Sequence, residues 1–319
     1  MSAATKGGDP REGSGSGLVA NSGEMFVRRA QQFRARGTTR PARGTRRAGC
    51  RRADLSSAVL HMQQQSPLGL SNEETRIPDD ELPKYRKADG LTDADWDKMF
   101  ARLGHEARTQ RQIATMTLAA NMRPDTVPRL IEMLRLEDTV PRRQAVQTLG
   151  AIGKPCVDAV CDELISTQDV TVRASCVKSL AALILNYPEL RLEFPQRALD
   201  TLKSVVHESD QVTKLATVMC LGVLGSRDVT RDIPGSPAAI DLLLDILSVT
   251  QDVGLGASVV MSLGSIGTCG DADRVLDGLR GAVESMKDIE GGDYIAQLAE
   301  AQIEKLSSSS LADSVSKIN

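Results

Sequence analysis

The chain has 319 residues, of which 41% are apolar, 25% are charged and only 3% are aromatic. This balance excludes a wholly disordered or collagen-like chain. The shortage of aromatic side chains favours a helical core of Ala, Leu, Val and Ile over an aromatic-rich β-sandwich. No apolar run approaches the length of a membrane-spanning helix. The six cysteines form no CxxC pair, which indicates reduced thiols in a reducing compartment.

The charge is divided between two segments. Residues 1–60 carry 12 basic and 4 acidic residues, whereas the remainder carries 27 basic and 38 acidic residues. Ten arginines and no acid lie between Met25 and Ala53, a composition typical of an organelle transit peptide. A solvated basic arm and a nucleic-acid tether are the alternatives, because clustered arginines also neutralise phosphates.

The composition also sets the domain boundaries. We expect a disordered Arg-rich transit peptide at residues 1–55, with Met25 as an alternative start because the preceding residues include three acids. A polar, Pro-punctuated linker is predicted at 56–90, a repeat domain at 91–306, and a Ser-rich flexible tail at 307–319.

Four segments of the repeat domain superimpose without gaps. They begin at Asp138, Asp169, Asp210 and Asp252, at spacings of 31, 41 and 42 residues. Apolar residues recur seven, eight and eleven positions after each Asp, which is a helical stripe. The Asp stands where an N-cap is needed. Each segment therefore predicts a helix, and these four are called the signature helices.

A second amphipathic helix precedes each signature helix. A further pair lies at each end, in the segments beginning at Leu91 and Asp271, where the helical spacing remains but the signature is lost. Such pairs cannot bury their apolar stripes alone. We therefore predict an all-α fold, a right-handed α-solenoid of about six helix pairs.

The signature helices end in a repeated motif, LGAIG at 149–153, LGVLG at 221–225 and LGSIG at 263–267. This motif resembles the HEAT-like repeats of phycobilin lyases and phycobilisome-degradation proteins, over residues 91–306. The resemblance implies tetrapyrrole or antenna-protein handling and, with the presequence, a eukaryotic plastid relative. The segments 186–194 and 226–236 depart from it as insertions, and no lyase motif identifies binding residues.

A basic residue stands four positions after three of the signature Asp residues. We expect each base to pair with the Asp of a neighbouring repeat and to hold the stack in register. Binding of a propionate or phosphate is the alternative. The predicted structural ladder consists of Asp138, Arg142, Asp169, Arg173, Asp210 and Lys214.

No catalytic or metal constellation stands out. His105-Glu106 and His207-Glu208 are similar to the His-Glu ligand pairs of a di-iron HEAT-like hydroxylase family, but that site needs four pairs at equivalent repeat positions. The chain has only three histidines, too few for most zinc sites or catalytic triads. We therefore expect no metal and no catalytic residue.

The other face of the signature helices is predicted to bind a partner. Positions six, nine and ten after each Asp should point away from the core, toward a concave groove that becomes apolar and sulfur-bearing toward the C-terminal end. Soft Met side chains suit a helix or a flat hydrophobic ligand. The predicted partner-binding residues are Gln147, Lys178, Met219, Cys220 and Met261.

The sequence therefore predicts a noncatalytic scaffold in the plastid stroma, with the mitochondrion as the alternative compartment. Its expected partner is another protein, such as a photosynthetic antenna or tetrapyrrole-pathway protein, and no cofactor is expected. The alternative function is a subunit of a bilin lyase, which would handle an open-chain tetrapyrrole. A third reading is a nucleic-acid binder that uses the basic N-terminal arm.

Overall fold

A computed structural model describes residues 81–86, 90–268, 272–286 and 291–316. The predicted transit peptide at 1–55 and most of the predicted linker lie outside the described residues. The described part is built from α-helices with two short 3₁₀ turns, and its strand-like pairing is one isolated bridge between Asp228 and Ile233. The all-α prediction is confirmed. No helix in this part is long and apolar enough to cross a bilayer.

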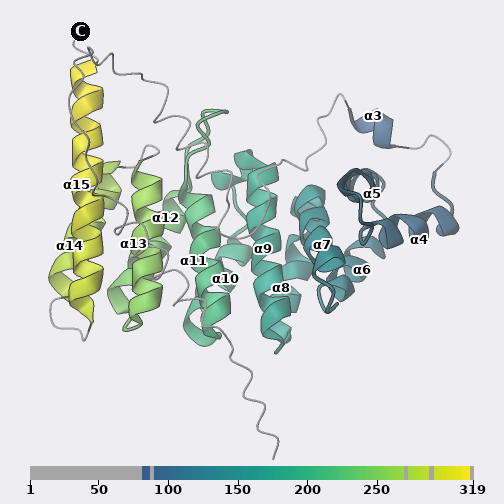
Figure 1. The fold of residues 1–319 in the computed structure, drawn as a ribbon, viewed down its shortest axis with the longest axis horizontal. Helices are drawn as coiled ribbons and strands as arrows, with labels where there is room; N and C mark the ends of the chain where they lie inside the picture. The colour runs from purple at the N-terminus through teal and green to yellow at the C-terminus, as the bar shows by residue number, and fades with distance from the viewer. Residues whose placement is uncertain (1–80, 87–89, 269–271, 287–290, 317–319) are drawn as a thin grey trace, which may run out of the picture. The chain divides into compact units, whose positions relative to one another are not determined.

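The helices form two layers (Figure 1). One layer holds the signature helices with a helix at each end, and each member packs on the next. Its members are α5 (Arg108–Ala120), α7 (Thr139–Ile152), α9 (Val170–Asn186), α11 (Gln211–Gly225), α13 (Val253–Gly267) and α15 (Gly292–Ser316). The outer layer is made of α4 (Asp93–Arg102), α6 (Thr126–Met133), α8 (Val157–Ser166), α10 (Gln196–Glu208), α12 (Pro237–Val249) and α14 (Ala272–Met286). Each outer helix packs on the signature-layer helix that follows it, which confirms the predicted helix pairs.

The apolar stripe of the signature helices faces the outer layer. Leu149, Leu180, Leu221 and Leu263 are at most 1% exposed, and they belong to one continuous core. The glycine after Leu149 has a packing role, because a Cβ on Gly150 would lie 2.6 Å from Cβ of Ala182 and 2.9 Å from its carbonyl carbon. Gly150 thus lets α7 and α9 approach closely.

The four signature Asp residues are N-caps, as the sequence predicts. Each Asp precedes its helix in an extended conformation, and its carboxylate accepts a backbone N–H from the first turn. These bonds satisfy amides that have no partner within the helix. The four signature helices therefore begin at equivalent positions of their repeats.

Two helices lie in segments that were predicted to be a linker and a flexible tail. The predicted linker contains a short helix, α3 (Leu82–Tyr85), that packs on α5. The side-chain amide of Asn121 donates to the carbonyl of Tyr85 at 2.8 Å, which fixes the end of this segment. The predicted flexible tail continues α15 as far as Ser316, because serines are tolerated in a helix that earlier residues have already nucleated.

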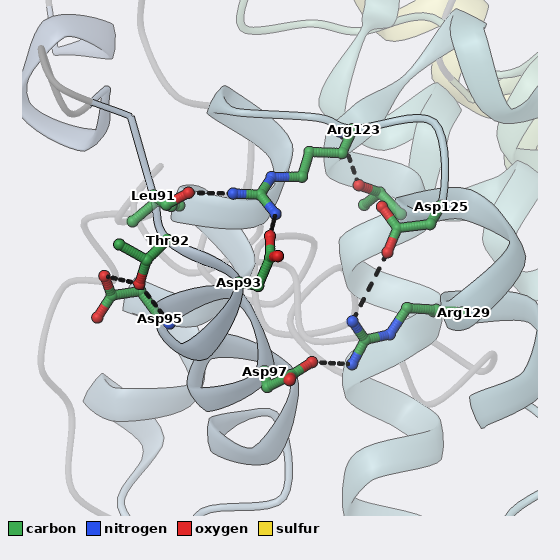
Figure 2. Close-up of polar contacts among 9 residues, drawn as sticks. Leu91, Thr92, Asp93, Asp95, Asp97, Arg123, Asp125 and Arg129 are labelled. Carbon is green, nitrogen blue, oxygen red and sulfur yellow. Dashed lines mark hydrogen bonds and ion pairs between the residues drawn. The ribbon is translucent and has the colours of Figure 1, made fainter.

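Two arginines form ion pairs with α4, the first helix of the first pair (Figure 2). Arg123 Nη1 lies 2.9 Å from Asp93 Oδ1, and Arg129 Nη2 lies 2.9 Å from Asp97 Oδ1. The two guanidinium groups also cover aromatic rings, with Arg123 4.6 Å from the ring centre of Trp96 and Arg129 3.9 Å from that of Phe100. These cation–π contacts cover the aromatic side chains at the N-terminal end of the core, where the first helix pair has a neighbouring repeat on one side.

The insertion at 186–194 is anchored at both ends. The Tyr187 hydroxyl donates to the carbonyl of Ala151 at 2.6 Å. The buried Arg191, within the short 3₁₀ turn Pro188–Arg191, donates from Nε to the carbonyl of Ser226 at 2.9 Å. The insertion at 186–194 is therefore held against the start of the insertion at 226–236.

Candidate functional site

The candidate site is the strip of the signature helices that remains open to solvent between neighbouring helices. The residue nine positions after each Asp lies on this strip, which we call the signature face. Gln147, Lys178 and Met219 are half-buried there, and Met261 is 50% exposed. The structure thus places four of the five predicted partner-binding residues on one face.

The fifth predicted residue, Cys220, is not on this face. Its side chain is fully buried within the core. Each signature helix packs against a helix on either side as well as against the outer layer, so only a narrow strip stays open. Positions six and ten after the Asp fall between neighbouring helices, and Gln144 and Ala216 at position six are buried with Cys220. The predicted exposure of these positions is wrong, except in α13, where Ser258 and Ser262 are half-buried.

The N-terminal half of the signature face is cationic. Arg142 and Arg143 lie on α7, and Lys178 lies on the adjacent α9. Burial lowers the pKa of the Lys178 amine, and the positive charges of Arg143 and Arg142 lower it further. Within the described residues none of the three side chains is in an ion pair with a carboxylate. Positive charge is thus concentrated here without local neutralisation.

The C-terminal half of the face is apolar. On α11 the side chains of Leu215, Met219 and Val223 are half-buried and pack against the core from its open side. At the start of the same helix Val212 is 56% exposed. Met261 continues this surface on α13. Flexible, polarizable Met side chains among aliphatic ones suit contact with another apolar surface.

A polar network lies behind the cationic half, between α5 and α7. The Gln144 amide donates to Thr115 Oγ1 at 2.7 Å and to Gln147 Oε1 at 3.1 Å. The hydroxyls of Thr115 and Thr148 are 2.9 Å apart. These bonds satisfy the buried polar groups and fix Gln147 at the surface.

The predicted ladder of basic residues has a different role from the one expected. Arg173 does pair with the Asp of the next repeat, with Nη1 3.6 Å from Asp210 Oδ2. Arg142, however, donates to the carbonyls of Leu136 and Glu137 in the turn between α6 and α7, at 2.8 and 3.4 Å. Lys214 makes no ion pair in the described part, and the link from α11 to Asp252 is made by the Gln211 amide at 3.1 Å. Of the expected ion pairs between repeats, the described part therefore contains the one between Arg173 and Asp210. Arg142 binds carbonyl groups of the turn within its own repeat instead.

An arginine outside the predicted ladder also binds the turn within its own repeat. Arg111 donates to the carbonyls of His105 and Glu106, both at 2.7 Å. Its spacing of 31 residues from Arg142 equals that between Arg142 and Arg173, and this spacing was the signal that could have identified it. All three arginines bind the carbonyl six residues before them, so they brace the turn within each repeat.

Ion pairs between repeats lie mainly on the outer layer. Each joins an arginine to an acid of a neighbouring outer helix, and sequence reasoning missed them because they follow no fixed register. They are Arg129–Asp97, Arg135–Glu163, Arg197–Asp158, Arg197–Asp162 and Arg274–Asp241. Most are exposed, and exposed pairs of this kind contribute little stability individually.

The described thiols are not placed for chemistry. Cys156, Cys161, Cys176 and Cys220 are free and buried. Burial raises the pKa of Cys156 and of Cys220 to about 12, and it raises the pKa of Cys161 and Cys176 as well. A thiol with such a pKa is a poor nucleophile near neutral pH. His105 and His207 are exposed, and no group of three metal-ligating side chains occurs among the described residues.

Comparison with known proteins identifies the repeats. Residues 97–181 match the family described as HEAT repeats. The chain is 28% identical over 207 residues to "Uncharacterized phycocyanin operon protein Z" of Pseudanabaena tenuis, which covers 65% of this chain and 93% of that protein. The chain therefore contains HEAT repeats, and it is similar to this phycocyanin operon protein over most of that protein's length.

Other known proteins resemble this HEAT-like chain. It is 26% identical over 153 residues to "Bilin biosynthesis protein CpeZ" of Synechococcus sp., over 48% of this chain and 78% of that protein. Among solved structures, an engineered protein covers 67% of this chain at 18% identity with a TM-score of 0.37. The complex of CpcE and CpcF of phycocyanin lyase from Nostoc sp. covers 69% at 20% identity with a TM-score of 0.26.

Proposed function

We propose that this chain is a noncatalytic HEAT-like scaffold of the plastid stroma that binds another protein through the signature face during the handling of bilins or light-harvesting proteins. The observation that carries the proposal is the apolar half of the face. Val212 and Met261 are each at least half exposed, and Leu215 and Met219 lie between them. Adjacent exposed apolar side chains are a feature of protein-interaction surfaces.

The names of the two relatives support the tetrapyrrole context. One is a phycocyanin operon protein and the other a bilin biosynthesis protein. The expected partner is therefore a protein that carries or receives a bilin.

A second candidate function is a subunit of a bilin lyase. It is favoured by the cationic half of the face, because Arg143 and Lys178 provide positive charge beside an apolar surface. An open-chain tetrapyrrole has the matching properties, a flat apolar body and carboxylate-bearing side chains. In this function the chain would orient the bilin while a thiol of the acceptor protein attacks it.

Co-expression separates the two functions. The chain would be produced in bacteria with bilin-forming enzymes and a phycocyanin subunit, with and without an independent bilin lyase. Zinc-enhanced fluorescence of the subunit after denaturing electrophoresis measures covalent attachment. A scaffold should increase attachment only when the lyase is present, whereas a lyase subunit that suffices alone should attach bilin without it. No effect in either case would contradict both functions.

The plastid location requires its own test. A fusion of residues 1–60 to a fluorescent protein should be imported by isolated chloroplasts and shortened by processing. Uptake by mitochondria alone would place the protein in the alternative compartment.

A further inference from the structure

An exposed methionine lies beside a side-chain amide at the C-terminal end of the signature face. Met261 of α13 is 50% exposed, and Gln302 of the adjacent α15 is half-buried. The Gln302 amide donates to the Met261 sulfur, with Nε2 3.7 Å from Sδ. A thioether is a weak hydrogen-bond acceptor. The contact therefore places a strong donor on one side of a sulfur that solvent reaches from the other side.

The absence of a side chain at Gly264 gives the Gln302 amide its place. Gly264 stands one turn after Met261 on α13, and a Cβ there would lie 2.7 Å from Cδ of Gln302 and 2.9 Å from its Cγ. The end of Gln302 thus occupies the space that a side chain at position 264 would fill. This packing holds the amide over α13, within reach of the sulfur.

The other methionines of the described part lack this combination of exposure and a donor. Met122, in the turn between α5 and α6, is 45% exposed, and in that part of the chain its sulfur accepts no hydrogen bond. Met122 is therefore a matched comparison for Met261 within the same molecule. The remaining described methionines are less accessible: Met99, Met116 and Met286 are buried, and Met133 and Met219 are half-buried.

An exposed thioether reacts with hydrogen peroxide by oxygen transfer. A sulfur lone pair attacks one peroxide oxygen, the O–O bond breaks, and the products are methionine sulfoxide and water. The sulfur has two lone pairs, so the reaction can give two sulfoxide epimers. At Met261 the Gln302 amide lies against one lone pair and leaves the other accessible. The local geometry therefore favours one epimer.

We propose that Met261 is a site of reversible oxidation by hydrogen peroxide, that Gln302 restricts the product to one sulfoxide epimer, and that the sulfoxide weakens binding at the apolar half of the signature face. Oxidation converts an apolar side chain into a polar one, which an apolar partner surface would have to desolvate. Dithiol-dependent reductases reverse the step, since the dithiol becomes a disulfide and the oxygen leaves as water. The effect on binding rests on the proposed function, whereas the site and its epimer do not.

The oxidation site is tested on the full-length chain without a partner. The native protein is treated with hydrogen peroxide and digested, and mass spectrometry measures the sulfoxide at each methionine. Portions of the digest are then reduced with methionine sulfoxide reductase A or B, each of which acts on one epimer. Met261 should be oxidised faster than Met99 and Met286. One reductase should remove most of its sulfoxide, whereas the sulfoxide of Met122 should need both reductases.

Two variants test the role of the amide. Gln302→Ala removes it, and Gly264→Ala displaces it from its place over α13. Both variants should still be oxidised at Met261 but should give both epimers there. The matched control is Gln297→Ala, an exposed glutamine of the same helix α15, which should retain the single epimer. Thermal unfolding of each variant shows whether the fold is retained.

The effect on binding is tested with an untreated phycocyanin subunit, which is added after the peroxide has been removed. Oxidation of the wild-type chain should lower recovery of the subunit about fivefold or more, the effect of burying one unsatisfied polar group, and reduction of the sulfoxide should restore it. For Met261→Leu, treated and untreated samples of the variant should recover equal amounts. Met122→Leu should lose recovery on treatment as wild type does.

Four results would overturn the inference. Protection of Met261 to the level of the buried methionines would exclude the site. Equal amounts of the two epimers in the wild-type chain would exclude selection by Gln302, and so would a single epimer in Gln302→Ala. A peroxide effect on binding that persists in Met261→Leu would assign the effect to another methionine.

The oxidation site and the proposed function fail in different ways. If the untreated chain recovers no phycocyanin subunit but Met261 forms a single epimer that depends on Gln302, the site stands and the function does not. If the untreated chain recovers the subunit and the oxidised chain recovers as much, the function stands and Met261 does not regulate it.

Discussion

Arg173 connects two successive repeats: its Nη1 lies 3.6 Å from Oδ2 of Asp210, the residue that caps the next signature helix. The same guanidinium donates from Nε to the carbonyl of Thr167 at 2.9 Å and from Nη2 to Gln168 Oε1 at 2.8 Å. One side chain thus braces the turn within its own repeat and orients the beginning of the following one. Only a planar group with several donors can do both.

Replacing Arg173 by Ala should lower the free energy of unfolding by about 1–3 kcal/mol, because a partly buried side chain loses several charge-assisted hydrogen bonds. The matched control is Lys214→Ala, at the equivalent position of the next repeat, where the described structure holds no ion pair. Its cost should remain within about 0.5 kcal/mol. Urea unfolding measures both. Equal losses would show that the Arg173 contacts contribute nothing specific.

The same pair predicts a pH dependence. Burial opposes ionisation of Asp210, yet its pKa lies below the ordinary value because the side chain and amide of Thr213 donate hydrogen bonds to it and Arg173 lies nearby. A depressed carboxyl pKa stabilises the fold above the unfolded-state pKa, and this stabilisation is lost as the pH falls through the folded-state pKa. The melting temperature of wild type should therefore exceed that of Asp210→Asn by a constant amount above about pH 5, and the difference should shrink below about pH 4. A difference independent of pH would contradict this.

The glycines of the LG motif should differ in their tolerance of a methyl group. In α7, a Cβ on Gly150 would meet Cβ and backbone atoms of Ala182, which cannot move without shifting α9. In α13, a Cβ on Gly264 would meet only the end of the flexible Gln302 side chain, with its nearest atom at 2.2 Å. Gly150→Ala should therefore cost about 1–3 kcal/mol by overpacking, and Gly264→Ala much less. A reversed order in thermal unfolding would show that the contact between α7 and α9 is looser than described.

The sequence was sufficient for features that depend on local chemistry. The caps at Asp138 and Asp210 are predictable because an N-cap bond spans only two or three residues, and Leu149 is predictable because a helical stripe follows from spacing alone. The burial of Cys220 was not predictable in the same way, since it depends on how closely the four neighbouring helices pack around α11. The pair Arg129–Asp97 was missed for a related reason: it joins outer helices whose sequences do not repeat.

The described cysteines should resist modification in the folded protein. Burial raises the pKa of Cys156 and Cys220 to about 12, so the thiolate fraction near neutral pH is very small. With Cys50 and Cys269 changed to Ser, a thiol-specific disulfide reagent should react slowly with the native chain and label four thiols after denaturation. Fast labelling under native conditions would show that these thiols become exposed by local opening.

The last prediction concerns the apolar half of the signature face. Met219→Glu combined with Met261→Glu should weaken binding of a bilin-carrying partner, because an apolar contact would then have to desolvate two carboxylates. The fold should be nearly unaffected, since Met261 is half exposed and Met219 lies at the open side of α11. Circular dichroism and thermal unfolding check the fold, and co-purification with a co-expressed phycocyanin subunit measures the binding.

The control for this double variant also changes exposed apolar side chains to Glu. Ile165 and Val249 are 58% and 63% exposed and lie at the ends of the outer helices α8 and α12. Ile165→Glu with Val249→Glu adds the same charge to the protein away from the signature face, so it separates a local effect from a change in net charge. Reduced recovery in the Met variant alone would assign the contact to the signature face. Equal recovery of the partner by both variants and by wild type would remove this face from the interaction and direct attention to the insertion at 226–236, where Val229 is 67% exposed.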